Sequence, residues 1–548
     1  MEDRRYDVIV IGAGPAGCRA AAVLAENGKR TALADCVSPG GACLRTGCIP
    51  TKKLSLAAAW LRRRLRGESA GSLLSAQCPD SKNMEYNGSP ADRENQHLKD
   101  DIRQTAWEDL LQETAQTAKE MTEGIRLVQM SRRVRLLEGE EVFPERGPEG
   151  LGIEIGGEKY SAKDIVLAPG SAPMVPESVL LSAKKNSSAG FYTTDTLREM
   201  KTLPDRLIVI GGGAAGCEIA DAMSAFVPAV ELCEAGEQIL TSWSREPRRA
   251  VRRILERHGV RIRENCRSSD AWLDEVLKSM PPCQEKREKQ ENPEGGLQEP
   301  GPVHGKTDHI PEKTVRTAVL TAVGRRPAFP ARKAHALGLH LTRDGYIRAD
   351  ASGRTANPHV FCIGDANGQE KTAYYGTWQA EQAAELILQK DMDRGESSQL
   401  FPDPGRKTLP ETDAVREWER MCAPACLHID PPAACVGMSI EEIRARGYII
   451  RTGKGPVYAS GAARIREYTD GSVTVWRDTK TDLLLGACVI APEAEEIIHL
   501  LQSYILYRIP CSQICRQVFA HPSLSELVRM AVEDACGGSP ELPVKRRR

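Results

Sequence analysis

Two cysteines that lie close together are the residues of this chain best suited to redox chemistry. Cys43 and Cys48 are five positions apart within residues 40–52, which read GGACLRTGCIPTK. Thiols at this spacing can form a disulfide in a small ring if the backbone brings their Cα atoms within about 7 Å. Gly47 and Pro50 favour such a bend, and an exposed, strained disulfide is reduced more easily than a structural one. The spacing alone leaves a second interpretation open, in which both are buried free thiols.

A glycine-rich motif precedes the two cysteines, and a second copy of it occurs later in the chain. Residues 6–11 are an apolar run that predicts a strand, GAGPAG follows, and residues 18–27 have the periodicity of a helix. The later copy has an apolar run at residues 206–210, then GGGAAG, then a helical pattern at residues 217–226. Strand, glycine turn and helix in this order form a dinucleotide-binding unit. The loop residues expected to contact the nucleotides are Gly12, Gly14, Pro15, Ala16 and Gly17 in the first copy, and Gly211, Gly213 and Gly216 in the second.

Each copy is followed by a short apolar run that ends in an acid. Asp35 and Glu234 both stand 23 residues after the first glycine of their loop. In a dinucleotide-binding unit such an acid binds the ribose 2′-hydroxyl and repels a 2′-phosphate. Residues 235–238 contain no arginine that could receive that phosphate, so the second site is predicted to prefer NAD over NADP. The alternative, two surface loops with structural glycines, would not share this spacing.

The composition describes a chain of several domains with no excess of charge. Its 548 residues correspond to roughly three to four domains. With 74 basic and 75 acidic residues the net charge is −1, which favours neither nucleic acid nor a membrane surface as a partner. The 17 cysteines are scattered, as is typical of thiols in a reducing compartment, so we expect a cytoplasmic protein.

Three polar segments are interpreted as inserts that run over the surface. They are residues 66–101, 281–312 and 391–412, which are rich in charged residues, Gly, Ser, Asn or Pro. Segments of this composition bury little apolar surface. No functional residue is assigned to them.

Several motifs together resemble the class I pyridine nucleotide-disulfide oxidoreductases, a family of FAD-dependent enzymes. Residues 40–52 resemble the family's GGxCxxxGCxPxK signature, which is highly specific. Residues 165–171 (IVLAPGS) resemble its ATGS linker, and residues 321–327 (TAVGRRP) its VGRRP motif. Residues 360–365 (VFCIGD) resemble its second FAD motif, and residues 520–526 (AHPSLSE) its catalytic HPxxxE segment. The resemblance covers nearly the whole chain outside the inserts.

The resemblance implies an α/β fold with two Rossmann-like domains and a C-terminal α+β interface domain that makes a homodimer. We expect an FAD-binding domain at residues 1–172 and an NAD-binding domain at residues 173–318. Residues 319–390 would return to the FAD domain, residues 391–420 would be a linker, and residues 421–548 the interface domain.

The resemblance also implies roles for single residues around the flavin. Cys43 would exchange with the substrate, and Cys48 would contact the flavin. Lys52 would lie near flavin N5 and pair with Glu218. The remaining expected contacts with FAD or NAD are Gly41, Gly170, Ser171, Gly324, Asp365, Thr372 and Ala373.

The acid–base group implied by the family is a histidine from the partner subunit. His521 would hold this role, and Glu526 would orient its ring. A nearby imidazole can take the proton of a thiol and stabilise the resulting thiolate, which is what thiol exchange requires.

Within the family the pattern is closest to dihydrolipoamide dehydrogenase. Glutathione reductase-like members carry basic residues where Glu234 stands, and mercuric reductase-like members end in a vicinal cysteine pair, where this chain has the single Cys536. The implied reaction is oxidation of protein-bound dihydrolipoamide by NAD, and the implied partner is a lipoyl domain of a 2-oxo acid dehydrogenase or glycine cleavage complex. Two alternatives stay open: an NADH-dependent reductase of another disulfide, and a flavoprotein that acts as a redox sensor or scaffold.

The chain departs from the family pattern at three positions. Pro169 replaces the threonine of ATGS, Tyr374 stands where dihydrolipoamide dehydrogenases have histidine, and Phe519 replaces the first histidine of HxHP. These differences leave the disulfide substrate open. No metal site is predicted, because the CAPACLH segment at residues 422–428 lacks a fourth ligand.

Overall fold

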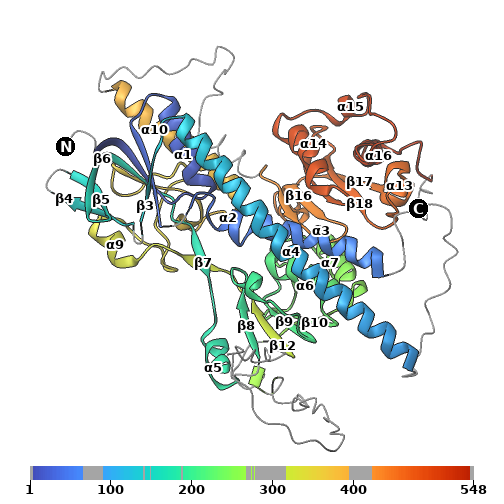
Figure 1. Cartoon of the computed structure of the whole chain (residues 1–548). Coiled ribbons are helices and arrows are strands. Elements are labelled where there is room, and N and C mark those ends of the chain that lie inside the picture. The colour runs from blue at the N-terminus through green and yellow to red at the C-terminus, as the bar shows by residue number, and fades with distance from the viewer. Residues whose placement is uncertain are drawn as a thin grey trace, which may run out of the picture.

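The structure, a computed structural model, describes residues 4–36, 38–65, 90–139, 142–147, 150–186, 189–266, 273–274, 277, 316–393 and 422–543. Figure 1 shows three bodies built on separate sheets, with the long helix α4 running diagonally across them. The predicted fold class, two Rossmann-like sheets followed by a C-terminal α+β unit, is confirmed.

The first sheet carries the first glycine loop. Its strand order is β3-β2-β1-β6-β5-β4, and β14 pairs with β6. These strands are β1 (Arg5–Ile11), β2 (Thr31–Asp35), β3 (Arg135–Glu138), β4 (Pro144–Gly147), β5 (Gly150–Ile155), β6 (Glu158–Leu167) and β14 (Val360–Cys362). Val8, Ile9 and Val10 are fully buried in β1, as expected of a central parallel strand covered on both faces. Because β14 follows the second sheet in the chain, the polypeptide returns to the first sheet there.

Helices cover both faces of this sheet and extend beyond it. They are α1 (Pro15–Glu26), α2 (Gly41–Arg45), α3 (Cys48–Leu65), α4 (Pro90–Ser131), α9 (Ala331–Ala336) and α10 (Ala373–Asp393), with a 3₁₀ turn, η3 (Gly364–Asn367). Helices α1 and α10 pack on each other, and α3 packs on α4. The second α-helix of the disulfide region, α3, begins at Cys48 itself.

The structure corrects one of the predicted inserts. Helix α4 begins at Pro90, so residues 90–101 are helical rather than irregular. Six of these twelve residues are Ala, Arg, Glu, Gln, Leu or Lys, which are strong helix formers, a preference that the polar composition obscured. Residues 66–89, the whole of 281–312 and the segment after Asp393 lie outside the described residues.

The second sheet carries the second glycine loop. It is entirely parallel in the order β11-β10-β9-β12-β8. Its strands and flanking helices are β8 (Gly190–Thr193), β9 (Arg206–Ile210), β10 (Ala229–Cys233), β11 (Val260–Arg263), β12 (Thr317–Thr321), α5 (Glu177–Lys185), η2 (Leu197–Glu199), α6 (Ala214–Phe226) and α7 (Arg245–Arg257). Strand β12 spans the predicted domain boundary at residue 318. The short antiparallel pair β7 (Ser171–Pro173) and β13 (Arg325–Pro327) lies where the chain passes between the two sheets.

The third sheet is antiparallel, in the order β15-β16-β19-β18-β17. Its strands and helices are β15 (Ala425–Leu427), β16 (Ala433–Gly437), β17 (Ile450–Pro456), β18 (Ser472–Asp478), β19 (Leu484–Ile490), α12 (Ile440–Ala445), η4 (Val457–Ala459), α13 (Gly461–Ile465), α14 (Ala494–Leu506), α15 (Cys511–Ile514) and α16 (Glu526–Cys536). Helix α16 packs closely on β17, because a Cβ at Gly453 or Gly455 would lie about 2 Å from its backbone: 1.9 Å from Ala531 O and 2.2 Å from Leu527 O. This contact fixes α16, whose first residue is Glu526.

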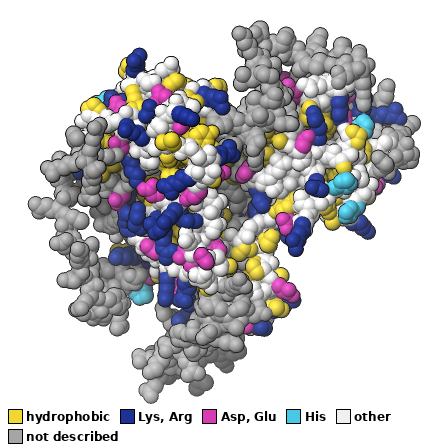
Figure 2. Space-filling model, turned by 180° about the vertical axis from the view of Figure 1, so that it is seen from behind, with side chains coloured by type: hydrophobic (Ala, Val, Ile, Leu, Met, Phe, Trp, Pro, Cys, Tyr) yellow, Lys and Arg dark blue, Asp and Glu magenta, His cyan; other side chains and the backbone are white. Residues whose placement is uncertain are grey.

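Helix α7 joins the second body to the third through polar contacts. Lys454 pairs with Glu246 at 2.6 Å, and Arg257 pairs with Asp470 at 2.5 Å. The view from behind in Figure 2 shows many Lys and Arg side chains close together, with acidic side chains among them. Within the described residues, no helix is both long and apolar enough to cross a membrane, and no group of three or more His, Cys, Asp or Glu side chains could hold a metal ion.

Candidate active site

A cavity of about 470 Å³ at the carboxyl ends of β1, β2 and β6 gathers most of the residues predicted to bind the flavin. Among its lining residues are Gly12, Gly14, Pro15, Ala16, Asp35, Gly41, Cys43, Cys48, Gly170, Ser171, Asp365, Thr372 and Ala373. Gly17, Lys52 and Gly324 do not line it. Ligands of parallel α/β sheets bind at this end of the strands.

The glycines of the first loop leave room that a side chain would fill. Gly12 has a φ of +102°, and a Cβ there would lie 2.1 Å from Ala168 O. A Cβ at Gly17 would lie 1.8 Å from Gly12 O, so α1 can pack this close only without one. At Gly14 the nearest atom to such a Cβ is Gly41 Cα at 4.0 Å. The backbone is therefore open where a pyrophosphate would approach, and these residues fit FAD.

The second loop repeats this geometry at the end of β9. Gly211 has a φ of +112°, and a Cβ at Gly216 would lie 1.8 Å from Gly211 O. A Cβ at Gly213 would meet nothing within 4 Å, so the loop is open to a ligand. The Glu234 carboxylate accepts a hydrogen bond of 2.6 Å from the Gly212 N–H, which holds the acid beside the loop. These residues fit NAD, with Glu234 positioned for a ribose hydroxyl.

The two predicted redox cysteines occupy adjacent helices, and both are reduced in this structure. Cys43 lies in α2, and Cys48 is the first residue of α3. The hydrogen bond that the Cys43 thiol donates to Cys48 raises the pKa of Cys43 and lowers the pKa of Cys48 to about 6. Burial opposes the shift at Cys48, whereas the positive charge of Lys52 adds to it. A helix N-terminus also favours a thiolate. At neutral pH Cys48 is therefore the thiolate of the pair, and Cys43 keeps its proton.

Lys52 and Glu218 form the ion pair that the sequence led us to expect. Lys52 Nζ lies 3.2 Å from Glu218 Oε2, and the Glu218 side chain is only 8% exposed. Glu218 also accepts a 2.7 Å hydrogen bond from the His428 N–H, which comes from the third body. The buried carboxylate of Glu218 thus connects three elements: α3, which begins at Cys48, α6, which follows the second glycine loop, and the segment that follows β15.

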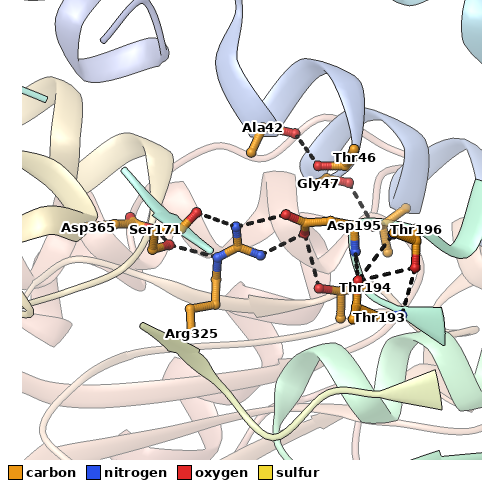
Figure 3. Close-up of polar contacts among 11 residues, drawn as sticks. Ala42, Thr46, Gly47, Ser171, Thr193, Thr194, Asp195, Thr196, Arg325 and Asp365 are labelled. Carbon is orange, nitrogen blue, oxygen red and sulfur yellow. Dashed lines mark hydrogen bonds and ion pairs between the residues drawn. The ribbon is translucent and has the colours of Figure 1, made fainter. Parts of the chain in front are cut away.

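A hydrogen-bond network in the wall of the cavity includes two residues that the sequence interpretation missed, Arg325 and Asp195 (Figure 3). Arg325 donates from Nε to Ser171 Oγ at 2.7 Å and from Nη2 to Ser171 O at 2.7 Å. The Ser171 hydroxyl donates to the Asp365 carboxylate. On its other side Arg325 binds Asp195 in a bidentate pair of 2.8 and 3.2 Å. Arg325 stands in the VGRRP motif, which could have identified it, whereas no sequence signal marked Asp195.

We expect Arg325→Gln to loosen the flavin site. The change removes the ion pair with Asp195 and the bonds to Ser171, so the free energy of unfolding should fall by about 2 kcal/mol. FAD should also dissociate more readily, because Ser171 and Asp365 would no longer be held in place. Thermal unfolding and the flavin-to-protein absorbance ratio after dialysis measure both effects. Arg326→Gln is the matched control, because Arg326 is an exposed neighbour. Equal loss of FAD in both variants would contradict the role of Arg325.

The predicted acid–base pair lies away from the cavity of its own chain. His521 Nδ1 is 3.1 Å from Glu526 Oε1, and the Ser523 N–H donates to the same carboxylate at 3.0 Å. The His521 side chain is 77% exposed, and no described imidazole lines the flavin cavity. The hydrogen bonds from Ser523 and His521 lower the pKa of Glu526 against the effect of burial, which keeps it an anion that can orient the ring. Among the described residues of one chain, therefore, the cavity has no imidazole of its own to accept a proton.

Comparisons with known proteins extend over almost the whole chain. Dihydrolipoyl dehydrogenase of Thermus scotoductus is 29% identical over 535 residues, which cover 97% of each chain. Dihydrolipoyl dehydrogenase of Chlorobaculum tepidum is 28% identical over 533 residues, again covering 97% of each. Two solved structures share the fold. The HOCl-induced flavoprotein disulfide reductase RclA of Escherichia coli matches with a TM-score of 0.68, 21% identity and coverage of 96% of this chain and 99% of that one. LpdA of Mycobacterium tuberculosis matches with a TM-score of 0.69, 19% identity and the same coverage.

Two family models account for the three bodies of the structure. The model described as pyridine nucleotide-disulphide oxidoreductase matches residues 6–383, and the model of that family's dimerisation domain matches residues 423–532. The second match supports a homodimer. The predicted cofactors, FAD and NAD, are confirmed as those of the family. This chain belongs to the pyridine nucleotide-disulphide oxidoreductases, as its two glycine loops and its paired cysteines indicated.

Proposed function

We propose that this protein is a dihydrolipoyl dehydrogenase that oxidises a dihydrolipoyl group on a carrier protein with NAD. The observation that supports the proposal most strongly is that Cys43 and Cys48 both line the flavin cavity, next to the Lys52–Glu218 ion pair. The hydrogen bond between the two cysteines and the charge of Lys52 lower the pKa of Cys48. The curated relatives named dihydrolipoyl dehydrogenase support the choice of substrate. The carrier would be a lipoyl domain of a 2-oxo acid dehydrogenase or glycine cleavage complex, in the reducing cytoplasm.

The proposed thiol chemistry begins from the oxidised protein, in which Cys43 and Cys48 form a disulfide. The partner subunit contributes the second His521 of the homodimer, whose imidazole removes a proton from the substrate dithiol. The resulting thiolate attacks Cys43 Sγ, the S–S bond breaks, and Cys48 leaves as a thiolate. The second substrate thiol then attacks the first substrate sulfur and gives its proton to the departing Cys43, which closes the lipoyl ring. The protein is left with both cysteines reduced, as they are in this structure.

The residues around the cysteine pair stabilise the charge on Cys48 and would bind the two cofactors. Lys52 stabilises the negative charge on Cys48, and the ion pair with Glu218 holds Lys52 near that end of α3. The first glycine loop, Asp35, Ser171 and Asp365 would hold FAD, which would supply two-electron transfer between the cysteine pair and NAD. Glu234 and the second glycine loop would hold the NAD.

Steady-state assays distinguish this reaction from its closest alternative. We expect NAD reduction with dihydrolipoamide to be faster than NADH oxidation with glutathione disulfide or other small disulfides, and NADP to be a poor substitute. A reductase of another disulfide is the second candidate, favoured by Tyr374, whose hydroxyl bonds to Pro424 O at 2.6 Å where relatives of the proposed type have histidine. Fast NADH-dependent reduction of another disulfide, with no activity on dihydrolipoamide, would favour that candidate.

The charge of Cys48 predicts a pH dependence. A thiolate next to oxidised flavin gives a long-wavelength absorbance, so the band should appear on anaerobic addition of NADH. Because the pKa of Cys48 is lowered to about 6, the band should be complete at neutral pH, fall to half near pH 6 and be lost in more acidic solution. Lys52→Gln should move the midpoint to higher pH, because it removes a positive charge. Lys53→Gln, whose lysine pairs with Glu113 instead, should not move it. A midpoint unchanged by Lys52→Gln would contradict this account.

A further inference from the structure

A second cavity, of about 290 Å³, lies beside the flavin cavity at the junction of the first two bodies. It is lined from one side by the turn before α3 and by helices α3 and α4. Six residues of the segment 194–201, which follows β8, and Ile219 of α6 line it from the other side. None of the residues predicted to contact FAD, NAD or the substrate disulfide lines it. Pockets at domain junctions are frequent ligand sites.

The wall of this cavity is apolar and is held rigidly. Leu54, Trp107 and Ile219 are among its lining residues, and each is at most 3% exposed. The Trp107 indole N–H donates to Met200 O at 2.6 Å. The Gln104 side chain bonds to the backbone just after Met200, donating to Lys201 O at 3.0 Å and accepting from the Leu203 N–H at 3.0 Å. Helix α4 is thus attached to the segment that forms the opposite wall, so the cavity is formed before any ligand arrives.

The charged residues that line the cavity favour an anion. Arg45, Arg198 and Lys201 line the cavity, and Arg198 and Lys201 are exposed. Two carboxylates line it as well, but Asp195 is neutralised by its bidentate pair with Arg325, at 2.8 and 3.2 Å (Figure 3). Glu199 is the remaining acid. When the Asp195–Arg325 pair is left out, the lining residues carry three positive charges and one negative charge, that of Glu199.

We propose that this cavity binds a small organic anion with an apolar aryl or alkyl body and one carboxylate. Its volume equals that of about ten water molecules, enough for a body of roughly a dozen non-hydrogen atoms. The body would contact Trp107 and Leu54, and the carboxylate would face Arg198 and Lys201. This site does not depend on which disulfide the protein reduces or which dithiol it oxidises, and its ligand does not compete with NAD.

Calorimetric titration of the holoenzyme with three probes of one skeleton tests the proposal. 4-Phenylbutyrate should bind at one site per chain, at least about tenfold more tightly than 4-phenylbutan-1-ol or 4-phenylbutylamine. Saturating NAD should leave its affinity unchanged. The proposal fails if the acid does not bind, if the alcohol or the amine binds as tightly, or if NAD displaces the acid.

Variants locate the binding site on the protein. Ala118→Leu, which fills the cavity from α4, should abolish binding of the acid. Arg198→Gln combined with Lys201→Gln should bring the affinity for the acid down to that for the alcohol, and these exposed positions do not endanger folding. Lys119→Gln removes an exposed charge next to Ala118 that does not line the cavity, and it should bind the acid like the unaltered protein. Undiminished binding by the double variant would place the ligand elsewhere and overturn the proposal.

Discussion

Replacing Cys48 with serine is expected to lower the rate of dihydrolipoamide oxidation by at least about four orders of magnitude. The reason is that a hydroxyl cannot form the disulfide with Cys43 and cannot act as the leaving thiolate. The flavin contacts of the first glycine loop and of Asp365 do not involve Cys48, so the FAD content should stay the same. The rate of NAD reduction with dihydrolipoamide, per bound flavin, is the measurement.

A second substrate separates loss of the thiol chemistry from loss of the flavin site. Transfer of electrons from NADH to an artificial acceptor such as ferricyanide needs no disulfide, so Cys48→Ser should retain it. Cys36→Ser is the matched control, because Cys36 lines the same cavity but has no paired thiol in the proposed mechanism. It should keep both activities. Dihydrolipoamide oxidation by Cys48→Ser at a rate near that of the unaltered protein would rule out the Cys43–Cys48 mechanism.

The parts of the fold that the sequence predicted best are those where local signals agree with one another. Strands β2 and β9 begin and end where the apolar runs at residues 31–35 and 206–210 do, because each run is bounded by glycine or charged residues. Helix α4 was not predicted, because the polar residues 90–101 were interpreted by composition as an insert and no element was assigned to residues 102–131. Trp107 of α4 is buried by contact with α3 and α6, and the sequence does not show that these helices pack together.

The candidate site was predictable wherever a motif carried the chemistry. The Lys52–Glu218 pair joins positions 166 residues apart, and only resemblance to a family could suggest it. Asp195 lies 130 residues from Arg325 and belongs to no motif, so its contribution depends on the meeting of two bodies. The exposed position of His521 could not be read from the sequence either, because exposure is a property of the folded chain.

Replacing His521 with glutamine is expected to slow dihydrolipoamide oxidation by about 10²- to 10⁴-fold, which is the usual contribution of a general base. Glutamine keeps a polar side chain near Glu526 but cannot accept the proton of a thiol. NADH oxidation by ferricyanide should be retained, since it requires no such proton transfer. Phe519→Ala changes a neighbouring residue of the same segment, and the mechanism predicts little effect on the proton transfer.

Co-expression of two defective chains tests whether His521 acts across the dimer. In a mixed dimer of Cys48→Ser and His521→Gln chains, one site combines the intact cysteines of one chain with the intact histidine of the other. Random pairing makes about half of the dimers mixed, each with one complete site, so activity per chain should be about a quarter of that of the unaltered protein. If His521 served the cavity of its own chain, every site in the mixture would be defective. The mixture would then be no more active than His521→Gln alone. The 77% exposure of His521 and its absence from the lining of the cavity in its own chain favour the first outcome.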